Sequence, residues 1–278
     1  MKPGIYPDIL NEDYHAGPGI SASGLKLIAE RSPLHYWSAY LDPQREQRKT
    51  TPAMILGTAI HAAVLEPATF AERFHPAPDV DRRTKEGKLL YEVALGISTE
   101  QNATLISSDD YAAALKVQKS CRDHPLAQAI FAEGKAEQSV FWIDNETEVL
   151  CKCRPDWLMP GAIVDVKSTE DASAEAFMRS AYNWQYHIQA AFYMDGMAAA
   201  WGEPPEAFMF LAHEKTAPWA SAYYFADGEM IEAGRLEYRK ALRLYADCLN
   251  KDKWPGYAAT LQPLGLPRWV KKEESDAA

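Results

Sequence analysis

The pattern of hydrophobic and polar positions divides the chain into a mainly helical first half and a mixed second half. In the first half, apolar residues recur at helical spacing, for example Leu56, Ala59, Ile60 and Ala63. Ser21 or Ser23 can cap an early helix, and Pro33 is expected to interrupt the helical pattern. The pattern predicts a helix starting within 19–28, a helix resuming at 35–37, and helices over 52–65, 108–122 and 125–133. Residues 75–90 are expected to form a mobile, locally basic loop that leads into a helix.

The second half begins with short β-branched and aromatic segments. They predict three strands, at 139–143, 149–158 and 162–167, which two turns join into an antiparallel meander. Further along, the pattern predicts a helix over 173–200, strands over 207–213 and 220–225, and a helix from Asp227 to about 250. Helices, strands, a long helix and more strands indicate a mixed α/β domain.

No segment of the sequence has the composition of a long linker. We therefore expect one domain over 1–278, with a mainly helical part at 1–135 and a core at 136–250. The prolines after residue 250 predict that 251–278 wraps the surface as a tail.

Composition limits the possible classes of protein. The 278 residues include 29 Lys and Arg against 39 Asp and Glu, so the net charge is -10. A protein that coats DNA by bulk electrostatic attraction is therefore unlikely to have this sequence. No apolar run reaches the roughly 18 residues that a membrane helix needs, and the first residues lack the apolar core of a signal peptide. We expect a soluble, cytoplasmic protein with no membrane partner.

Candidate chemistry gathers around two of the predicted strands. Asp156 lies near the end of one strand, and Asp165 and Lys167 lie two apart on the next, so these two face the same side. A tight hairpin brings Asp156 alongside Asp165. Carboxylate oxygens are ligands that Mg²⁺ or Mn²⁺ prefers, and an ammonium group beside a metal can orient water or stabilise phosphate charge.

A lone Asp-x-Lys triplet is common by chance, and its residues are often solvated. Here Asp165 lies inside the apolar run Ile163–Val166. An unpaired carboxylate there would be costly, and a metal or Lys167 would compensate for it.

Pro-Asp, a spacer and Asp-x-Lys resemble the signature of the PD-(D/E)XK nuclease superfamily. Three further motifs resemble its RecB-like branch: Gly57-Thr58-Ala59-Ile60-His61, Tyr186-His187-Ile188-Gln189-Ala190-Ala191-Phe192-Tyr193, and Ser21-Ala22-Ser23-Gly24-Leu25 with Ser32-Pro33. Their order is most similar to the RecE-type exonuclease domain and more distantly to lambda exonuclease. The resemblance implies a mixed central β-sheet flanked by helices.

The resemblance also implies roles for individual residues. The implied metal ligands are Asp156, Asp165, the backbone carbonyl of Val166, His61 and Glu137. Lys167 would hold the attacking water, Gln189 would orient the water or the phosphate, and Tyr193 would line the site. Gln185 could share the face of Gln189. Glu133 and Glu148 are alternatives to Glu137, and both His61 and Tyr193 could instead be core residues.

The implied cofactor is Mg²⁺, with Mn²⁺ as a substitute. The iron–sulfur branch of the superfamily would place Cys-Pro where this chain has Ser32-Pro33, and the four cysteines lack the grouping that a cluster needs. We therefore predict no iron–sulfur cluster. Cys151 and Cys153 are expected to be buried, reduced thiols, with redox pairing as the alternative.

The implied function is a 5′-to-3′ exonuclease on double-stranded DNA that leaves 3′ single-stranded tails for recombination. The implied partners are DNA ends, copies of the chain in a ring (a tetramer ahead of a trimer) and a single-strand annealing recombinase. Arg82, Arg83 and Lys85 are candidates for DNA contact, although they could equally be solvated. The alternatives are a sequence-specific endonuclease, an inactive protein that binds DNA ends or docks a recombinase, and a hydrolase of another phosphoester.

Overall fold

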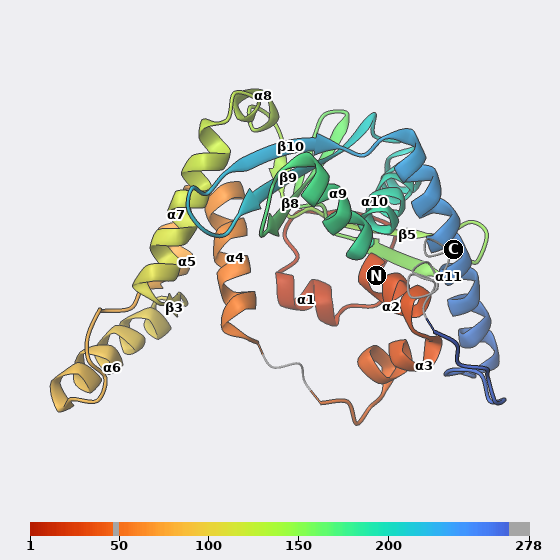
Figure 1. Ribbon diagram of the computed structural model, residues 1–278, viewed down its shortest axis with the longest axis horizontal. Helices are drawn as coiled ribbons and strands as arrows, with labels where there is room; N and C mark the ends of the chain where they lie inside the picture. The colour runs from red at the N-terminus through yellow and green to blue at the C-terminus, as the bar shows by residue number, and fades with distance from the viewer. Residues whose placement is uncertain (47–49, 267–278) are drawn as a thin grey trace, which may run out of the picture.

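The computed structural model describes residues 1–46 and 50–266 (Figure 1). The helices are α1 (Asn11–Ala16), α2 (Ala22–Glu30), α3 (Pro33–Tyr36), the π-helix η1 (Trp37–Leu41), α4 (Pro52–Leu65), α5 (Phe70–Arg73), α6 (Lys85–Glu100), α7 (Ser108–Asp123), α8 (Ala127–Ile130), α9 (Ala174–Asn183), α10 (Tyr186–Trp201) and α11 (Gly228–Lys251). The strands are β1 (Gly4–Tyr6), β2 (Phe74–Pro76), β3 (Thr104–Ile106), β4 (Lys135–Ala136), β5 (Ser139–Ile143), β6 (Leu150–Cys153), β7 (Trp157–Met159), β8 (Ala162–Thr169), β9 (Ala207–Glu214) and β10 (Ser221–Phe225).

The central sheet has five strands in the order β10-β9-β8-β7-β4. β8 and β9 run parallel, and the other neighbours are antiparallel, so the sheet is mixed. A smaller antiparallel sheet has the order β1-β5-β6, and β2 pairs with β3. The predicted mixed sheet is confirmed.

Helices cover both faces of the central sheet (Figure 1). Ile163 points into the core cluster that includes residues of α2, α9, α10 and α11. Its neighbour Val164 points into the other cluster, which includes residues of α4 and α7. This alternation follows from the period of two residues in a strand. β8 is therefore buried on both faces, and polar groups on it need partners.

Two glycines allow close packing around α10. A Cβ atom at Gly234 of α11 would lie 2.0 Å from the carbonyl oxygen of His187, and one at Gly196 would lie 2.5 Å from the Trp142 ring. Both distances are too short for a side chain, so the backbone of α11 approaches that of α10, and the Trp142 ring of β5 packs directly on the backbone of α10. This packing fixes α10, which carries Gln189.

The predicted three-stranded meander is partly wrong. β7 and β8 form the expected hairpin, with a turn at Pro160 and Gly161, whose φ of +75° suits glycine. β6 also pairs with β5 as expected, but the predicted strand 149–158 is two strands, β6 in the small sheet and β7 in the central sheet, and the chain crosses between the sheets at 153–157. The pairing of β6 with β5 ends before Pro155, because proline has no N–H to donate to a neighbouring strand. The Arg154 guanidinium donates to the Ile9 carbonyl and to Ser139 Oγ.

The predicted single helix over 173–200 is two helices. Trp184 ends α9, and Gln185 adopts a left-handed conformation with φ of +52° before α10 begins. Gln185 therefore lies outside α10 and does not share a helical face with Gln189, contrary to the sequence expectation.

The first half follows the predictions in outline. Ser21 caps α2, and α4 and α7 lie where expected. The expected break in the helical pattern lies between Glu30, the end of α2, and Pro33, the first residue of α3. The predicted loop at 75–90 that leads into a helix is correct only over 77–84, because β2 ends at Pro76 and α6 already begins at Lys85. α8 is shorter than the predicted helix, and β1, α1 and β3 were not predicted.

The second half ends largely as predicted. Asp227 caps α11, as the sequence indicates. After α11 the chain crosses α3, where the Leu34 amide donates to the Pro255 carbonyl and Trp254 stacks on Tyr36. Pro267 and the rest of the predicted tail lie outside the described residues. Cys151 and Cys153 are buried and unpaired. Within the described part of the chain, no helix is long and apolar enough to cross a membrane.

Candidate metal and catalytic centre

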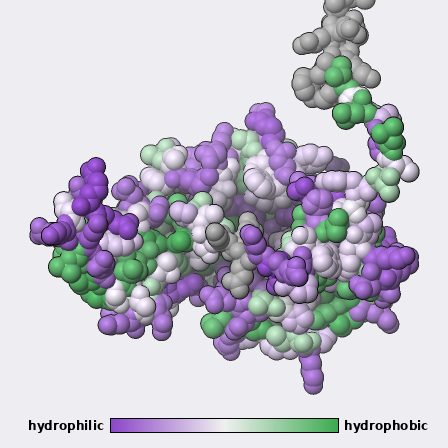
Figure 2. Space-filling view, turned by 90° about the horizontal axis from the view of Figure 1, so that it is seen from below, coloured by the Kyte–Doolittle hydropathy of each residue, from purple (hydrophilic) through white to green (hydrophobic). Residues whose placement is uncertain are grey.

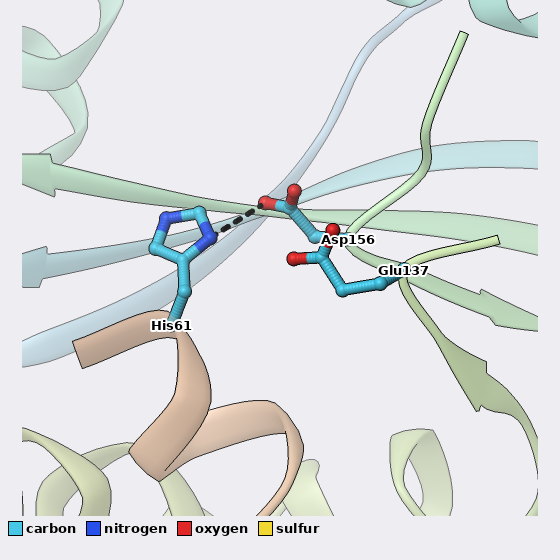
Figure 3. A group of neighbouring side chains, drawn as sticks. All are labelled: His61, Glu137 and Asp156. Atoms are coloured by element: carbon cyan, nitrogen blue, oxygen red, sulfur yellow. Dashed lines mark ion pairs between the residues drawn. The ribbon is translucent and has the colours of Figure 1, made fainter. Parts of the chain in front are cut away.

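Three donor groups from distant parts of the sequence meet beside β8. His61 comes from α4, Glu137 follows β4, and Asp156 precedes β7. One ligand atom of each lies within 4.8 Å of the others. Figure 3 shows the imidazole facing the two carboxylates, with His61 Nδ1 3.6 Å from Asp156 Oδ2. Of the three glutamates considered from the sequence, Glu137 is the one in this donor group.

Glu137 is held in an uncommon backbone conformation. Its φ is +53°, a left-handed value that costs free energy for a residue with a side chain. Its amide donates to the Asp156 carbonyl at 3.0 Å, and Arg154 Nε donates to Glu137 Oε2 at 2.6 Å. These contacts fix the carboxylate next to Asp156.

Asp156 is placed by the β7–β8 hairpin. Trp157 lies opposite Val164, so Asp156 lies opposite Asp165, as the sequence predicts. The Val166 amide donates to Asp156 Oδ2 at 2.7 Å. Because the N–H and C=O of one strand residue point to the same edge, the Val166 carbonyl faces the same opening.

The pKa of Asp156 lies well above its ordinary value. Burial is the largest cause, and the negative charges of Asp165 and Glu137 add to it. The donor group therefore carries electrostatic repulsion that a cation would relieve.

Asp165 and Lys167 form the neighbouring half of the centre. Asp165 is 1% exposed, and its Oδ2 forms an ion pair with Lys167 Nζ. Gln189 Nε2 donates to Asp165 Oδ1 at 2.7 Å. Burial would lower the pKa of Lys167, but the charges of Asp165 and Asp156 outweigh it and raise the pKa. Lys167 is therefore a stable cation beside two carboxylates.

The donor set fits a divalent cation. Two carboxylates supply hard oxygen ligands, and burial lowers the pKa of His61, which favours the neutral, metal-binding imidazole. The Val166 carbonyl stays a predicted ligand. Asp165 is not one of the three converging donors, and its buried Oδ2 is paired with Lys167 Nζ.

Tyr193 lies one helical turn after Gln189. It is partly buried and packs with the Phe208 ring at 6.1 Å. Burial raises the pKa of Tyr193 most, and the charges of Asp165 and Asp156 contribute. Its position is compatible with both readings from the sequence, a core residue and a residue lining the site.

Lys26 is a neighbour of the site that the sequence analysis missed. Its Nζ donates to the Trp184 carbonyl at 3.1 Å and to Gln189 Oε1 at 3.5 Å. Burial, followed by the charge of Lys167, lowers the pKa of Lys26 to about 7. The sequence does contain one sign of this position. Lys26 lies four residues after the apolar Ala22, so both residues share the side of the helix that faces the core.

The structure does not bring the candidate DNA-contact loop into the donor group. Arg83 forms an ion pair with Asp81, and Arg82 lies 3.8 Å from the Tyr91 ring centroid. Lys85 is the first residue of α6, which projects away from the central sheet (Figure 1). DNA contact by Arg82, Arg83 and Lys85 stays a prediction.

Comparisons with known proteins agree with the fold. The model of a family described as "PDDEXK-like domain of unknown function (DUF3799)" matches residues 21–264. No curated protein matches the chain. A solved protein from Eubacterium rectale, named "putative exonuclease", has the same fold, with a TM-score of 0.60 and 15% identity over 96% of this chain and 98% of that chain. A second solved structure, SSO0001, is less similar, with a TM-score of 0.30 and 14% identity over 60% of this chain and 71% of that chain.

The family match covers both halves of the centre, from α2 with Lys26 to α10 with Gln189. It confirms the PD-(D/E)XK resemblance that the motifs around Asp156, Asp165 and Lys167 suggest. The chain belongs to the DUF3799 family of PDDEXK-like domains.

Proposed function

We propose that this protein is a Mg²⁺-dependent deoxyribonuclease that degrades double-stranded DNA from 5′ ends. The observation that carries the proposal is the meeting of His61, Glu137 and Asp156 next to the Asp165–Lys167 pair. The PDDEXK-like fold and the name of the Eubacterium rectale protein support it.

A divalent cation bound by the donor group would lower the pKa of a coordinated water and neutralise charge on the phosphate. The residues of the chain have separate parts in hydrolysis. Lys167 holds the attacking water or a phosphate oxygen, Gln189 holds Asp165, and Arg154 holds Glu137. The water oxygen forms the new P–O bond, the ester P–O bond breaks, and the departing oxygen takes a proton. Mn²⁺ would serve in place of Mg²⁺ because both accept oxygen ligands.

The proposed biological product is a 3′ single-stranded tail for a single-strand annealing recombinase. A net charge of -10 favours a protein that admits DNA at a local basic site and repels it elsewhere. Lys167 and Lys26 are two cations beside the donor group that could meet the DNA backbone.

A ring of several copies would retain DNA through many cleavages. The apolar face of α6 supports association with another copy. Leu89, Leu90, Val93 and Ile97 are 47–61% exposed and lie on one side of this helix. Figure 2 shows hydrophobic surface at the end of the molecule where α6 lies. A 16-residue helix is marginally stable without packing, so this face is suited to a partner.

The experiment is digestion of linear duplex DNA labelled at either 5′ or 3′ ends, with closed circular duplex alongside. With Mg²⁺, we expect early release of the 5′ label, late release of the 3′ label and no cleavage of the circle. EDTA and Asp165→Ala should each stop the reaction while the protein stays folded by circular dichroism. Cleavage of the circle would favour the endonuclease, and an inert but DNA-binding wild type would favour the end-binding protein.

A further inference from the structure

Lys26 is a partly buried cation without a carboxylate partner among the described residues. The contacts of its ammonium group are two carbonyl oxygens, of Trp184 and the Gln189 amide, and the ring of Tyr186 at 5.3 Å. Neutral acceptors compensate a buried charge less well than an anion does. The position of Lys26 is therefore suited to an anionic ligand.

A second lysine with a lowered pKa provides a contrast. Lys152 Nζ donates to the carbonyls of Tyr14 and Gly17 at 2.7 and 2.6 Å, at the C-terminal end of α1. Cations near the last carbonyls of a helix are a common structural arrangement. Lys26 also meets the end of a helix, because Trp184 is the C-cap residue of α9, but its two contacts are longer, at 3.1 and 3.5 Å. A purely structural role therefore explains Lys152 better than Lys26.

The location of Lys26 connects it with the catalytic centre. Gln189 accepts from Lys26 through its oxygen and donates to Asp165 through its nitrogen, so the three groups form one chain. Lys26 and Lys167 both lie over the Tyr186 ring, at 5.3 and 4.8 Å from its centroid. Lys167 forms an ion pair with Asp165, whereas Lys26 reaches Asp165 only through Gln189 and forms no ion pair within the described residues.

We propose that Lys26 binds a DNA backbone phosphate next to the one that is cleaved, on the Gln189 side of the centre. This inference rests on the proposed nuclease function. The phosphate supplies the anion that Lys26 lacks, and the ion pair orients the strand across Asp165. A phosphate contact would also raise the pKa of Lys26 from its value of about 7, so the lysine stays charged in the complex.

The first test measures DNA affinity against salt concentration, with Ca²⁺ in place of Mg²⁺ to prevent cleavage. Lys26→Gln should reduce the slope of log K against log[salt] by about 0.9, the value for one phosphate contact. Lys26→Arg should keep the wild-type slope, because it keeps the charge. Lys240→Gln, at an exposed lysine of α11, is the matched control and should change nothing. An unchanged slope for folded Lys26→Gln would overturn the inference.

The second test separates a phosphate contact from a role in holding Gln189. Lys26→Gln should raise KM about tenfold and leave kcat nearly unchanged, with Lys26→Arg restoring KM. A fall in kcat at an unchanged salt slope would instead assign Lys26 to positioning Gln189.

The third test locates the phosphate. A neutral methylphosphonate linkage is placed at each position around the first cleavage site of a duplex end. At one position adjacent to the cleaved phosphate, the neutral linkage should remove the difference between wild type and Lys26→Gln. A difference that persists at both adjacent positions would overturn the assignment. A wild type that neither binds nor cleaves DNA would reject the proposed function itself.

Discussion

Two clusters in this molecule each contain three acidic residues, but a carboxyl group has a raised pKa in one and a lowered pKa in the other. One is the donor group, His61, Glu137 and Asp156, with Asp165 beside it. The other, which we call the α11 network, joins three acids, Asp144, Glu146 and Asp195, to three arginines of α11, Arg235, Arg239 and Arg243. Residues of the α11 network line a cavity of about 660 Å³.

The two clusters differ in how far positive charges compensate their carboxylates. Burial alone would raise the pKa of Asp144, but hydrogen bonds from Thr147 and the charge of Arg239 outweigh it and lower the pKa. In the donor group, burial and like charges raise the pKa of Asp156. The α11 network supplies its own counter-charges, whereas the charge of Asp156 in the donor group is opposed by the neighbouring carboxylates of Asp165 and Glu137.

The largest expected effect is on catalysis at the donor group. Asp156→Asn removes a ligand charge, so nuclease activity should fall on the order of 10³-fold or more. Without metal, the free energy of unfolding should stay the same or increase, because repulsion with Asp165 and Glu137 is relieved. Mg²⁺-dependent nuclease assays and urea unfolding in EDTA measure the two quantities. A variant that keeps activity would remove Asp156 from the centre.

The next effect is on stability at the α11 network. Asp144→Ala leaves Arg239 partly buried without its partner, so the free energy of unfolding should fall by about 3–5 kcal/mol. The activity of the protein that remains folded should be close to that of wild type. Urea unfolding and activity per folded molecule check this. Asp123→Ala, at an exposed helical ion pair, is the control and should cost less than about 0.5 kcal/mol. A large loss of activity in folded Asp144→Ala would place the α11 network in the catalytic centre.

Turn chemistry and strand alternation predict only the part of the site that lies on the β7–β8 hairpin. The two-residue turn at Pro160 and Gly161 specifies the β7–β8 register, and that register places Asp156 opposite Asp165. Alternation then puts Asp165 and Lys167 on one face. The resemblance to a known superfamily added His61 and Glu137, which no periodicity connects with Asp156.

Other features depend on tertiary packing and could not be predicted in this way. The break at Gln185 has no proline or glycine to mark it, and the crossing at Arg154 depends on partners in the N-terminal segment. Lys26 shows the same limit. Its helix has a clear apolar face, but only the packing of α2 against α10 brings its ammonium group to Gln189.

The smallest expected effect is the pH dependence of stability without metal. Asp156 has a folded-state pKa above its unfolded value, so its contribution is fully present below the unfolded pKa and is lost as pH rises through the folded pKa. Asp144 has a lowered pKa, so its contribution is present above the unfolded pKa and is lost only as pH falls through the lower folded value. Of these two residues, only Asp156 therefore changes the free energy of unfolding between about pH 5 and pH 8. Its contribution changes by no more than about 1.4 kcal/mol per pH unit.

Urea unfolding in EDTA across this range should show wild-type stability falling as pH rises, with a flatter profile for Asp156→Asn. Asp144→Asn should keep the wild-type slope at lower overall stability. Mg²⁺ should flatten the wild-type profile, because a bound cation keeps Asp156 ionised throughout. Parallel profiles for wild type and Asp156→Asn would mean that the repulsion in the donor group is already compensated within the chain, and the contrast with the α11 network would then fail.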